Sequence, residues 1–422
     1  MYTVNKKITV HAGDKGRYLT VPFSVKPGVH SLHLVCEYEY HFPKCVIQPA
    51  LYGPNGFRGS CALLKDGCTV SEEFATPGFL PGPVEPGEWR VVLAIASLDQ
   101  PEKEVSIEIT MEEDAPCWLK ADLHLHSHHS DGGFTPDEVN QLCRDAGLDV
   151  IALTDHNSFT QNIFQKTFAG LMRLPGFEWT TRLGHANFIG LERPADDFQA
   201  ETPEEAKQII QTAHDRGALI VLNHPGDPLG GWKAGYDIAF DAYEIWNGPW
   251  RDTNDNSLSL WQGMLSKGKK IPAVGGSDTH KAIPQTRHGC PCNHIYTQRR
   301  SAADVIAAIR AGRTYMTDCP QGPSLSFSLN GAFLGDTIAA KQENELTYEL
   351  KGLQPGDEIR LINEQGLVKR LFASMPTEIR CFHVADALFY RLEVWRKKGG
   401  KFAPVLLSNP IYLDFSDQQA SE

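Results

Sequence analysis

Short runs in which apolar and polar residues alternate dominate the first 117 residues. The runs "RYLTVPFSV" (17–25) and "EVSIEITMEE" (104–113) are examples, and Gly- and Pro-rich pieces such as "TPGFLPGPVEPGE" (76–88) separate them. A period of two is typical of β-strands with one buried face, and Gly/Pro pieces mark turns. We therefore expect residues 1–117 to form a β-sandwich-like domain of antiparallel strands.

The pattern changes at Trp118 to helical segments that are each followed by a glycine and an apolar run. The segment 135–147, "TPDEVNQLCRDAG", begins with a capping box, with Thr135 as N-cap and Glu138 three residues later. The segment 202–217, "TPEEAKQIIQTAHDRG", repeats this device. Apolar runs follow both, at 148–157 and 218–225. This alternation is typical of βα units around a parallel sheet or barrel, and residues 118–320 have room for six to eight of them.

The β pattern returns after Pro320. The runs "SLSFSLNGAF" (324–333) and "YRLEVWRKKGG" (390–400) alternate and end in turn residues. We expect residues 321–422 to form a second β-sandwich-like domain. The predicted fold class is therefore multidomain, with a central α/β region between two all-β regions.

Composition narrows the classes of function. The chain has 422 residues, of which 41% are hydrophobic and 22% charged, as expected for globular domains. Its net charge of -12 argues against a generic nucleic-acid-binding protein. We see no signal-peptide pattern and no run of 18 apolar residues, and expect no membrane association. The ten cysteines form no CxxC pair, so we interpret them as reduced thiols in a cytoplasmic protein.

Histidine is concentrated in the central region, where 11 of the 16 histidines lie between His124 and His294. His124 and His126 stand two apart in the strand-like run "LKADLHLH", so both should point to one face. Side chains of metal-binding type also follow the other apolar runs: Asp155, His156, Glu178, His185, His224, Glu244, Asn247, Asp278 and His280. Functional groups gather at the carboxyl ends of parallel strands.

A single histidine after a strand is more often a hydrogen-bonded structural residue than a ligand. The recurrence of His and Asp at successive strand ends nevertheless favours a metal site, because converging imidazoles and carboxylates need a cation between them. This mixture suits Zn, Mn or Fe. We interpret His128 and His129 as surface or outer residues. Glu244 is left open between a buried, paired carboxylate and a residue that approaches the metals.

The ordered motifs of this region resemble those of the PHP (polymerase and histidinol phosphatase) domain. They are "DLHLHSHHSDG" (122–132), "LTDHN" (153–157), "GFEWT" (176–180), "GHANFIG" (184–190), "LNHP" (222–225) and "GSDTH" (276–280). With β domains on both sides and the tail "LLSNPIYLDF", the whole chain also resembles the CehA/McbA group of PHP metallohydrolases.

The resemblance implies a distorted (β/α)7 barrel that holds two or three divalent ions. The first ion would be held by His124, His126, Glu178 and Asp278. Glu178 would bridge to a second ion bound by His185 and His224. Asp131, His156 and His280 would hold a third.

The function expected from this site is hydrolysis of a phosphate ester by metal-activated hydroxide, with a small-molecule ester as the substrate. Asp278, His280 and Asp155 are the expected catalytic residues, with Asp155 orienting an imidazole. The expected substrate contacts are Arg287, His288 and Asn247.

Two alternatives stay open at this stage. The same site would also suit hydrolysis of a carbamate or carboxylic ester, because hydroxide attacks carbonyl carbon and phosphorus alike. The other alternative is a non-catalytic protein that binds glycan or polymer through its β domains and has a structural barrel. The sequence also leaves open whether the protein forms a homo-oligomer.

Overall fold

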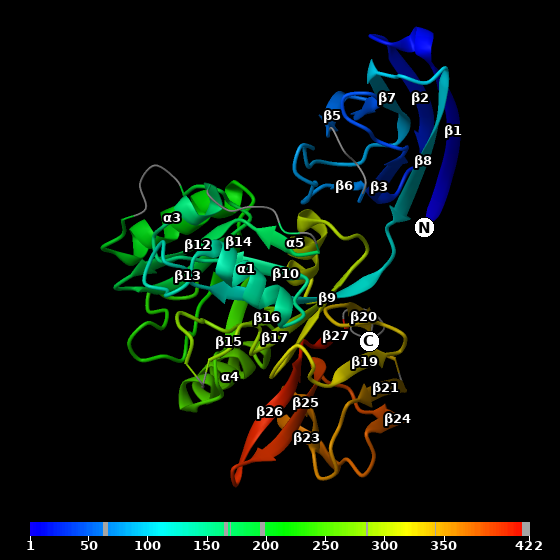
Figure 1. Ribbon diagram of the computed structural model, residues 1–422. Coiled ribbons are helices and arrows are strands. Elements are labelled where there is room, and N and C mark those ends of the chain that lie inside the picture. The colour runs from blue at the N-terminus through cyan, green and yellow to red at the C-terminus, as the bar shows by residue number, and fades with distance from the viewer. Residues whose placement is uncertain are drawn as a thin grey trace. The chain divides into compact units, whose positions relative to one another are not determined.

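The computed structural model describes residues 1–61, 66–163, 168, 170–194, 199–283, 286–341 and 343–415. The chain divides into two compact units (Figure 1). The first consists mainly of Met1–Cys117, with the short segments 170–172 and 298–301, and the second contains the remaining residues from Trp118 onward. Among the described residues, no helix has the length and apolar character needed to cross a bilayer.

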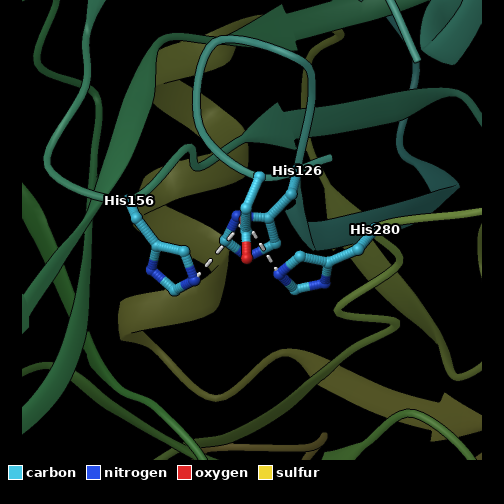
Figure 2. A group of neighbouring side chains, drawn as sticks. His126, His156 and His280 are labelled. Carbon is cyan, nitrogen blue, oxygen red and sulfur yellow. Dashed lines mark ion pairs between the residues drawn. The ribbon is translucent and has the colours of Figure 1, made fainter. Parts of the chain in front are cut away.

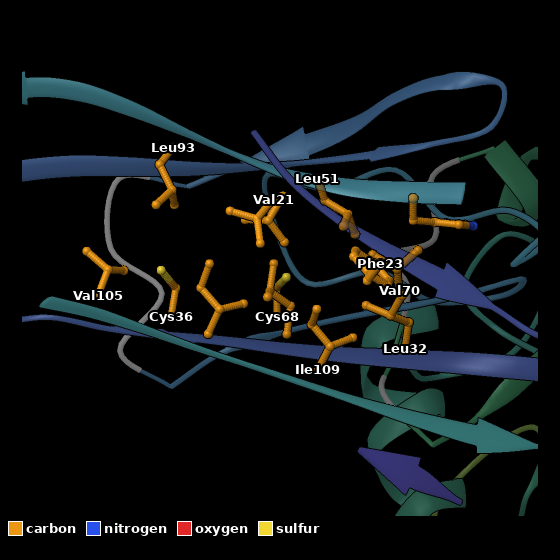
Figure 3. Close-up of a cluster of buried hydrophobic side chains, with 14 of the residues drawn as sticks. Val21, Phe23, Leu32, Cys36, Leu51, Cys68, Val70, Leu93, Val105 and Ile109 are labelled. Atoms are coloured by element: carbon orange, nitrogen blue, oxygen red, sulfur yellow. The ribbon is translucent and has the colours of Figure 1, made fainter. Parts of the chain in front are cut away.

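The first unit contains two four-stranded antiparallel sheets, in the orders β1-β8-β3-β6 and β2-β7-β4-β5. The strands are β1 (Tyr2–His11), β2 (Tyr18–Val25), β3 (Val29–Glu37), β4 (Val46–Gly53), β5 (Gly56–Ser60), β6 (Cys68–Ser71), β7 (Gly87–Ser97) and β8 (Glu102–Glu113). Burial alternates along them, most regularly in β8, as the sequence pattern predicts. The side chains of the two sheets meet in one hydrophobic core, in which Leu32, Leu93 and Ile109 are fully buried (Figure 3).

The central part of the second unit alternates short buried strands with helices. The strands are β9 (Cys117–Leu125), β10 (Val150–Leu153), β11 (Met172–Leu174), β12 (Gly176–Thr181), β13 (Gly184–Ile189), β14 (Leu219–Leu222), β15 (Ala242–Asn247), β16 (Ala273–Gly276), β17 (Cys292–Thr297) and β18 (Thr314–Thr317). The helices are α1 (Pro136–Asp145), α2 (Thr160–Ile163), α3 (Pro203–Asp215), α4 (Asp252–Leu265) and α5 (Ala302–Arg310). Both predicted capping boxes, at Thr135 and Thr202, are present.

These strands do not close into the predicted (β/α)7 barrel. β12-β13-β14-β15-β16 form one sheet, while β11-β10-β9-β17-β18 belong to another. Single bridges, Leu125 with Thr279 and His156 with Glu178, link the two sheets. Between β16 and β17 the Asn293 side chain takes the place of ladder bonds, since its amide bonds both the N–H (2.8 Å) and the C=O (2.7 Å) of Gly275.

The expected parallel βα rhythm is also interrupted. The pairs β9–β10, β14–β15 and β15–β16 are parallel, but β12–β13 and β13–β14 are antiparallel. A two-residue turn joins β12 to β13, which leaves no room for a crossover helix. Gly184 closes this turn with φ 121°, and a Cβ there would lie 2.5 Å from the Trp232 Cα. A glycine is therefore required at the hairpin.

Residues after Pro320 are mainly β structure, but one of their sheets continues the central one. β26 pairs with β18, and the order extends through β25 and β22 to β23. The strands are β19 (Ser324–Leu329), β20 (Thr337–Ala339), β21 (Asn344–Lys351), β22 (Glu358–Asn363), β23 (Gly366–Phe372), β24 (Thr377–Val384), β25 (Phe389–Lys398), β26 (Lys401–Ser408) and β27 (Ile411–Asp414). A second, three-stranded sheet has the order β19-β21-β24. Its buried side chains share one hydrophobic core with those of β22, β25 and β26.

The core of the first unit predicts a specific loss of stability. Ile109→Ala should lower the free energy of unfolding of this unit by about 2–5 kcal/mol, because it leaves a cavity between the two sheets. Glu108→Ala, at the exposed neighbouring position of the same strand, should change it by less than about 0.5 kcal/mol. Urea denaturation of the full chain measures both values, and equal midpoints for the two variants would contradict the packing described.

Candidate metal centre

The carboxylate of Glu178, on β12, lies at the centre of the site and is fully buried. Five imidazoles surround it. Its Oε2 lies 3.4 Å from His124 Nε2, 3.5 Å from His126 Nε2 and 2.8 Å from His156 Nδ1, and its Oε1 lies 3.0 Å from His185 Nδ1 and 3.5 Å from His224 Nε2. Asn223 also donates a hydrogen bond to Oε1, at 2.8 Å. Residues far apart in the sequence therefore meet at one carboxylate.

His124 near the end of β9 and His126 just after it point to the same side, as their spacing predicts. Both are fully buried, and their Nε2 atoms lie 3.4 Å and 3.1 Å from Oδ1 of Asp278. Asp278 has φ 50° and His224 has φ 27°, which are uncommon values for residues other than glycine. Strained backbone of this kind clusters at functional sites, where the surrounding structure holds it in place.

A second group forms on the more exposed side of the cluster. The side chains of His126, His156 and His280 point toward one another in Figure 2. Asp131 completes the group, with its Oδ1 3.3 Å from His280 Nε2 and 3.9 Å from His156 Nε2. The side chain of Asp131 is 62% exposed and that of His280 is 28% exposed, in contrast to the buried His126.

All nine residues predicted as ligands are brought together. Their ligand atoms form four overlapping groups, in each of which the atoms lie within 4.8 Å of one another: His126, Asp131, His156 and His280; His124, His224 and Asp278; His124, His126 and Glu178; and His156, Glu178 and His185. The grouping differs from the one expected, since His224 lies with His124 and Asp278, and His126 joins the group of Asp131.

Unsatisfied buried nitrogens show that the cluster suits cations. Carboxylate oxygens lie 3.1 to 3.5 Å from Nε2 of His124 and of His126, yet neither buried nitrogen has a hydrogen-bond partner among the described residues. Leaving such atoms unpaired away from water costs about 1–3 kcal/mol each. A divalent ion would satisfy both, and mixed imidazole and carboxylate ligands suit Zn, Mn or Fe. The buried cluster is thus compatible with metal ions.

Electrostatics within the cluster oppose the ordinary effect of burial. Burial alone would raise the pKa of the Glu178 carboxyl, but the charge of His124 and hydrogen bonds from neighbouring imidazoles hold that pKa well below its usual value. Burial likewise disfavours protonation of His124, but the charges of Asp278 and Glu244 raise its pKa well above the usual value. The carboxylates therefore stay ionised and favour positive charge at this position.

The described hydrogen bonds to Asp155 come from serines and not from an imidazole, contrary to the prediction. Its buried carboxylate accepts hydrogen bonds from the Ser127 N–H (2.8 Å), the Ser127 hydroxyl (2.8 Å) and the Ser130 hydroxyl (2.7 Å). These bonds hold the loop between His126 and Asp131. Because the serines of this loop bind the carboxylate, Asp155 supports His126 and Asp131 by fixing the backbone between them.

The three predicted substrate contacts lie in different places. Asn247 is next to the cluster, with its Nδ2 3.2 Å from Asp278 Oδ2. Arg287 and His288 instead line a pocket of about 720 Å³ together with Phe134 and Lys281, and none of the nine ligand residues lines it. Burial lowers the pKa of His288 to about 4. Contact of Arg287 and His288 with a substrate stays a prediction.

Two buried carboxylates that the sequence analysis did not assign also belong to the site. Glu244 lies 2.9 Å from His124 Nδ1. Asp122 accepts backbone N–H bonds from Ser277 (3.0 Å) and Gly289 (2.7 Å), and burial raises its pKa to about 6. Asp122 stands two residues before His124, so the strand period that paired His124 with His126 also places Asp122 on their face.

The bonds to Asp155 predict its contribution to stability. Asp155→Asn replaces one acceptor oxygen by an amide donor, which leaves a buried loop group unpaired. We expect the free energy of unfolding of the second unit to fall by about 1–3 kcal/mol in urea denaturation. Asp145→Asn keeps an acceptor oxygen for the exposed bond from Gln141 on α1 and removes only its charge, so it should cost at most about 0.5 kcal/mol. Equal stability of the Asp155 variant and the natural protein would show that the bonds from the loop to Asp155 do not stabilise the second unit.

Comparison with known proteins agrees with the motifs. Residues 122–237 match the family model described as PHP domain, a range that ends before Asp278 and His280. The uncharacterized protein MJ1587 of Methanocaldococcus jannaschii is 29% identical over 161 residues, which cover 34% of this chain and 90% of that protein.

Two solved structures show weaker likeness. One is a two-domain protein from Bacteroides vulgatus, described as containing a predicted PHP-like metal-dependent phosphoesterase (16% identity, TM-score 0.39, 69% of this chain and 96% of that chain). The other is an amidohydrolase from Chromobacterium violaceum (16% identity, TM-score 0.27, 40% and 90%). Both TM-scores are low, and neither likeness establishes a shared fold. The resemblance to the CehA/McbA group stays a prediction. Residues 122–237 of this chain are thus similar to the PHP domain.

Proposed function

We propose that this protein is a metal-dependent phosphoesterase that hydrolyses a small phosphorylated substrate. The observation that carries the proposal is the convergence of nine His, Asp and Glu side chains, in which the buried Nε2 atoms of His124 and His126 lack a hydrogen-bond partner within the described part of the chain. The similarity to the PHP domain adds support, because it covers seven of the nine residues: His124, His126, Asp131, His156, Glu178, His185 and His224.

The ligand residues differ in their access to solvent, so the site has a buried side and a side open to solvent. His124, His126 and Glu178 are fully buried, whereas Asp131 and His280 are partly exposed. Two or three divalent ions held here would supply an activated water and offset the charge of a phosphate ester. A substrate would approach past Asp131 and His280, while the buried residues fix the inner side of the site.

Removal of metal tests the proposed reaction. Hydrolysis of an aryl phosphate by the purified protein should fall to background after dialysis against a chelator and return on addition of Zn, Mn or Fe. Metal analysis of the protein before dialysis should find two or three ions per chain. A panel with an aryl phosphate, an aryl phosphodiester, an aryl carbamate and an aryl acetate identifies the bond.

The panel also separates the rival functions. Turnover of the carbamate or acetate alone would favour the carbamate or carboxylic ester hydrolase. A protein that carries no metal and hydrolyses none of these compounds would contradict the proposal and favour a binding protein.

A single ligand substitution should remove both metal and activity. His126 takes part in two of the ligand groups, so His126→Ala should lower the number of bound ions and reduce hydrolysis to background. His214→Ala is the control, because His214 lies on α3 and pairs with Asp241 instead of the cluster. Metal content and activity of the control should equal those of the natural protein, and retention of both by His126→Ala would refute the assignment.

A further inference from the structure

Glu244 is a buried carboxylate behind the metal cluster, and both of its oxygens are in use. It lies on β15 and is 2% exposed. Its Oε1 lies 2.9 Å from Nδ1 of His124. Its Oε2 accepts the backbone N–H of His224 at 2.8 Å and the Asn247 side-chain amide at 3.1 Å. One side chain therefore contacts three residues from different strand ends.

The contact with His124 selects the nitrogen that faces the cluster. A metal ion binds the neutral form of histidine, and a neutral imidazole that places Nδ1 against a carboxylate carries its proton there, which leaves Nε2 with a free lone pair. The Nε2 of His124 is the atom that faces Glu178 and Asp278 without a hydrogen-bond partner. Glu244 thus fixes both the tautomer and the orientation of this ring.

The contact with His224 holds a strained backbone. His224 has φ 27°, a left-handed conformation that a residue other than glycine adopts only at an energetic cost. The bond from its N–H to Glu244 Oε2 opposes this cost. Space for the carboxylate depends on Gly276, since a Cβ there would lie 2.5 Å from Glu244 Oε1 and 2.3 Å from the His124 Cβ.

Asn247 extends the same network to Asp278. Its Nδ2 lies 3.1 Å from Glu244 Oε2 and 3.2 Å from Asp278 Oδ2, and its Oδ1 accepts a bond from Arg251 Nη2 at 2.8 Å. The side-chain amide is therefore bonded on both its nitrogen and its oxygen. These bonds suit Asn247 to holding its neighbours in place better than to the predicted contact with a substrate.

Glu244 contacts His124 and His224 directly and reaches Asp278 through Asn247, and these three ligand residues form one group. We propose that Glu244, assisted by Asn247, is the positioning residue that preorganises this group for one divalent ion. The inference rests on the proposed metal-dependent function and deepens it, because it separates the support of one ion from that of the others. Glu244 acts through the ligands and contacts no substrate.

Zinc binding to the full chain tests the inference. Chelator-treated natural protein and Glu244→Gln are titrated with Zn²⁺ in equilibrium dialysis, and the unfolding midpoint of each metal-free protein is measured. Glu244→Gln keeps the size of the side chain but lacks the second acceptor oxygen. We expect one class of zinc site to weaken by about 10–100-fold, as is typical for loss of a partner behind a metal ligand, while the other sites keep their affinity.

Glu358→Gln is the matched control. Glu358 is also a buried glutamate of the second unit, 5% exposed on β22, but it pairs with Arg360 and Arg370. Its substitution should leave zinc binding unchanged even where it lowers the unfolding midpoint. If Glu244→Gln fails to fold, Asn247→Ala takes its place and should weaken the same class of site to a smaller extent.

The outcomes separate the two hypotheses. Weakening of a single class of zinc site in the Glu244 variant, with none in the Glu358 variant, supports the inference. Zinc affinities equal to those of the natural protein, or an equal loss at all sites, overturn it and leave the metal-dependent function standing. Absence of zinc binding by the natural protein overturns the proposed function and the inference together.

Discussion

The arrangement of the central region depends on one buried carboxylate, that of Glu178, and the imidazoles around it. An ionised carboxyl group loses its hydration when it is buried, and this is tolerated only where neighbouring groups replace the lost water. Here the replacement comes from His124, His126, His156, His185 and His224. Because these side chains come from β9, β13 and the segments after β10 and β14, their shared need for this carboxylate fixes how the two central sheets approach each other.

A set of further carboxylates supports the cluster from behind by binding backbone N–H groups. Asp122 holds Ser277 and Gly289, Asp155 holds the loop after His126, and Glu244 holds His224. Each acidic group thus fixes a segment that carries ligands. The unusual backbone at His224 and Asp278 is consistent with this arrangement, because strained residues persist where the surrounding contacts over-determine their position.

The sequence allowed the prediction of features that local rules control. The two capping boxes, the common face of His124 and His126, and the assembly of nine ligand types at strand ends all follow from short-range periodicity and position. The division of the central strands into two sheets does not, because it depends on contacts between distant residues, such as the Asn293 amide that takes the place of ladder bonds between β16 and β17.

The sequence also did not allow us to predict which side chains contact each other when they are far apart in the chain. Glu244 and His124 are 120 residues apart, and their contact depends on which strands are neighbours. Asp155 was expected to orient an imidazole, but Ser127 and Ser130 in the loop after His126 donate hydrogen bonds to it. Type and spacing thus identified the members of the cluster, whereas long-range pairing decided their grouping.

The pairing of β18 with β26 has a consequence for how the chain can be divided. Asn409, just after β26, bonds both the N–H and the C=O of Ala273 on β16 and the C=O of Thr314 on β18. A fragment truncated near Pro320 would lose these bonds and leave β18 as an unpaired edge, the kind of surface that pairs with strands from other molecules and aggregates. The C-terminal strands are therefore part of the scaffold of the His/Asp/Glu cluster, and a minimal fragment that keeps this cluster would have to retain them.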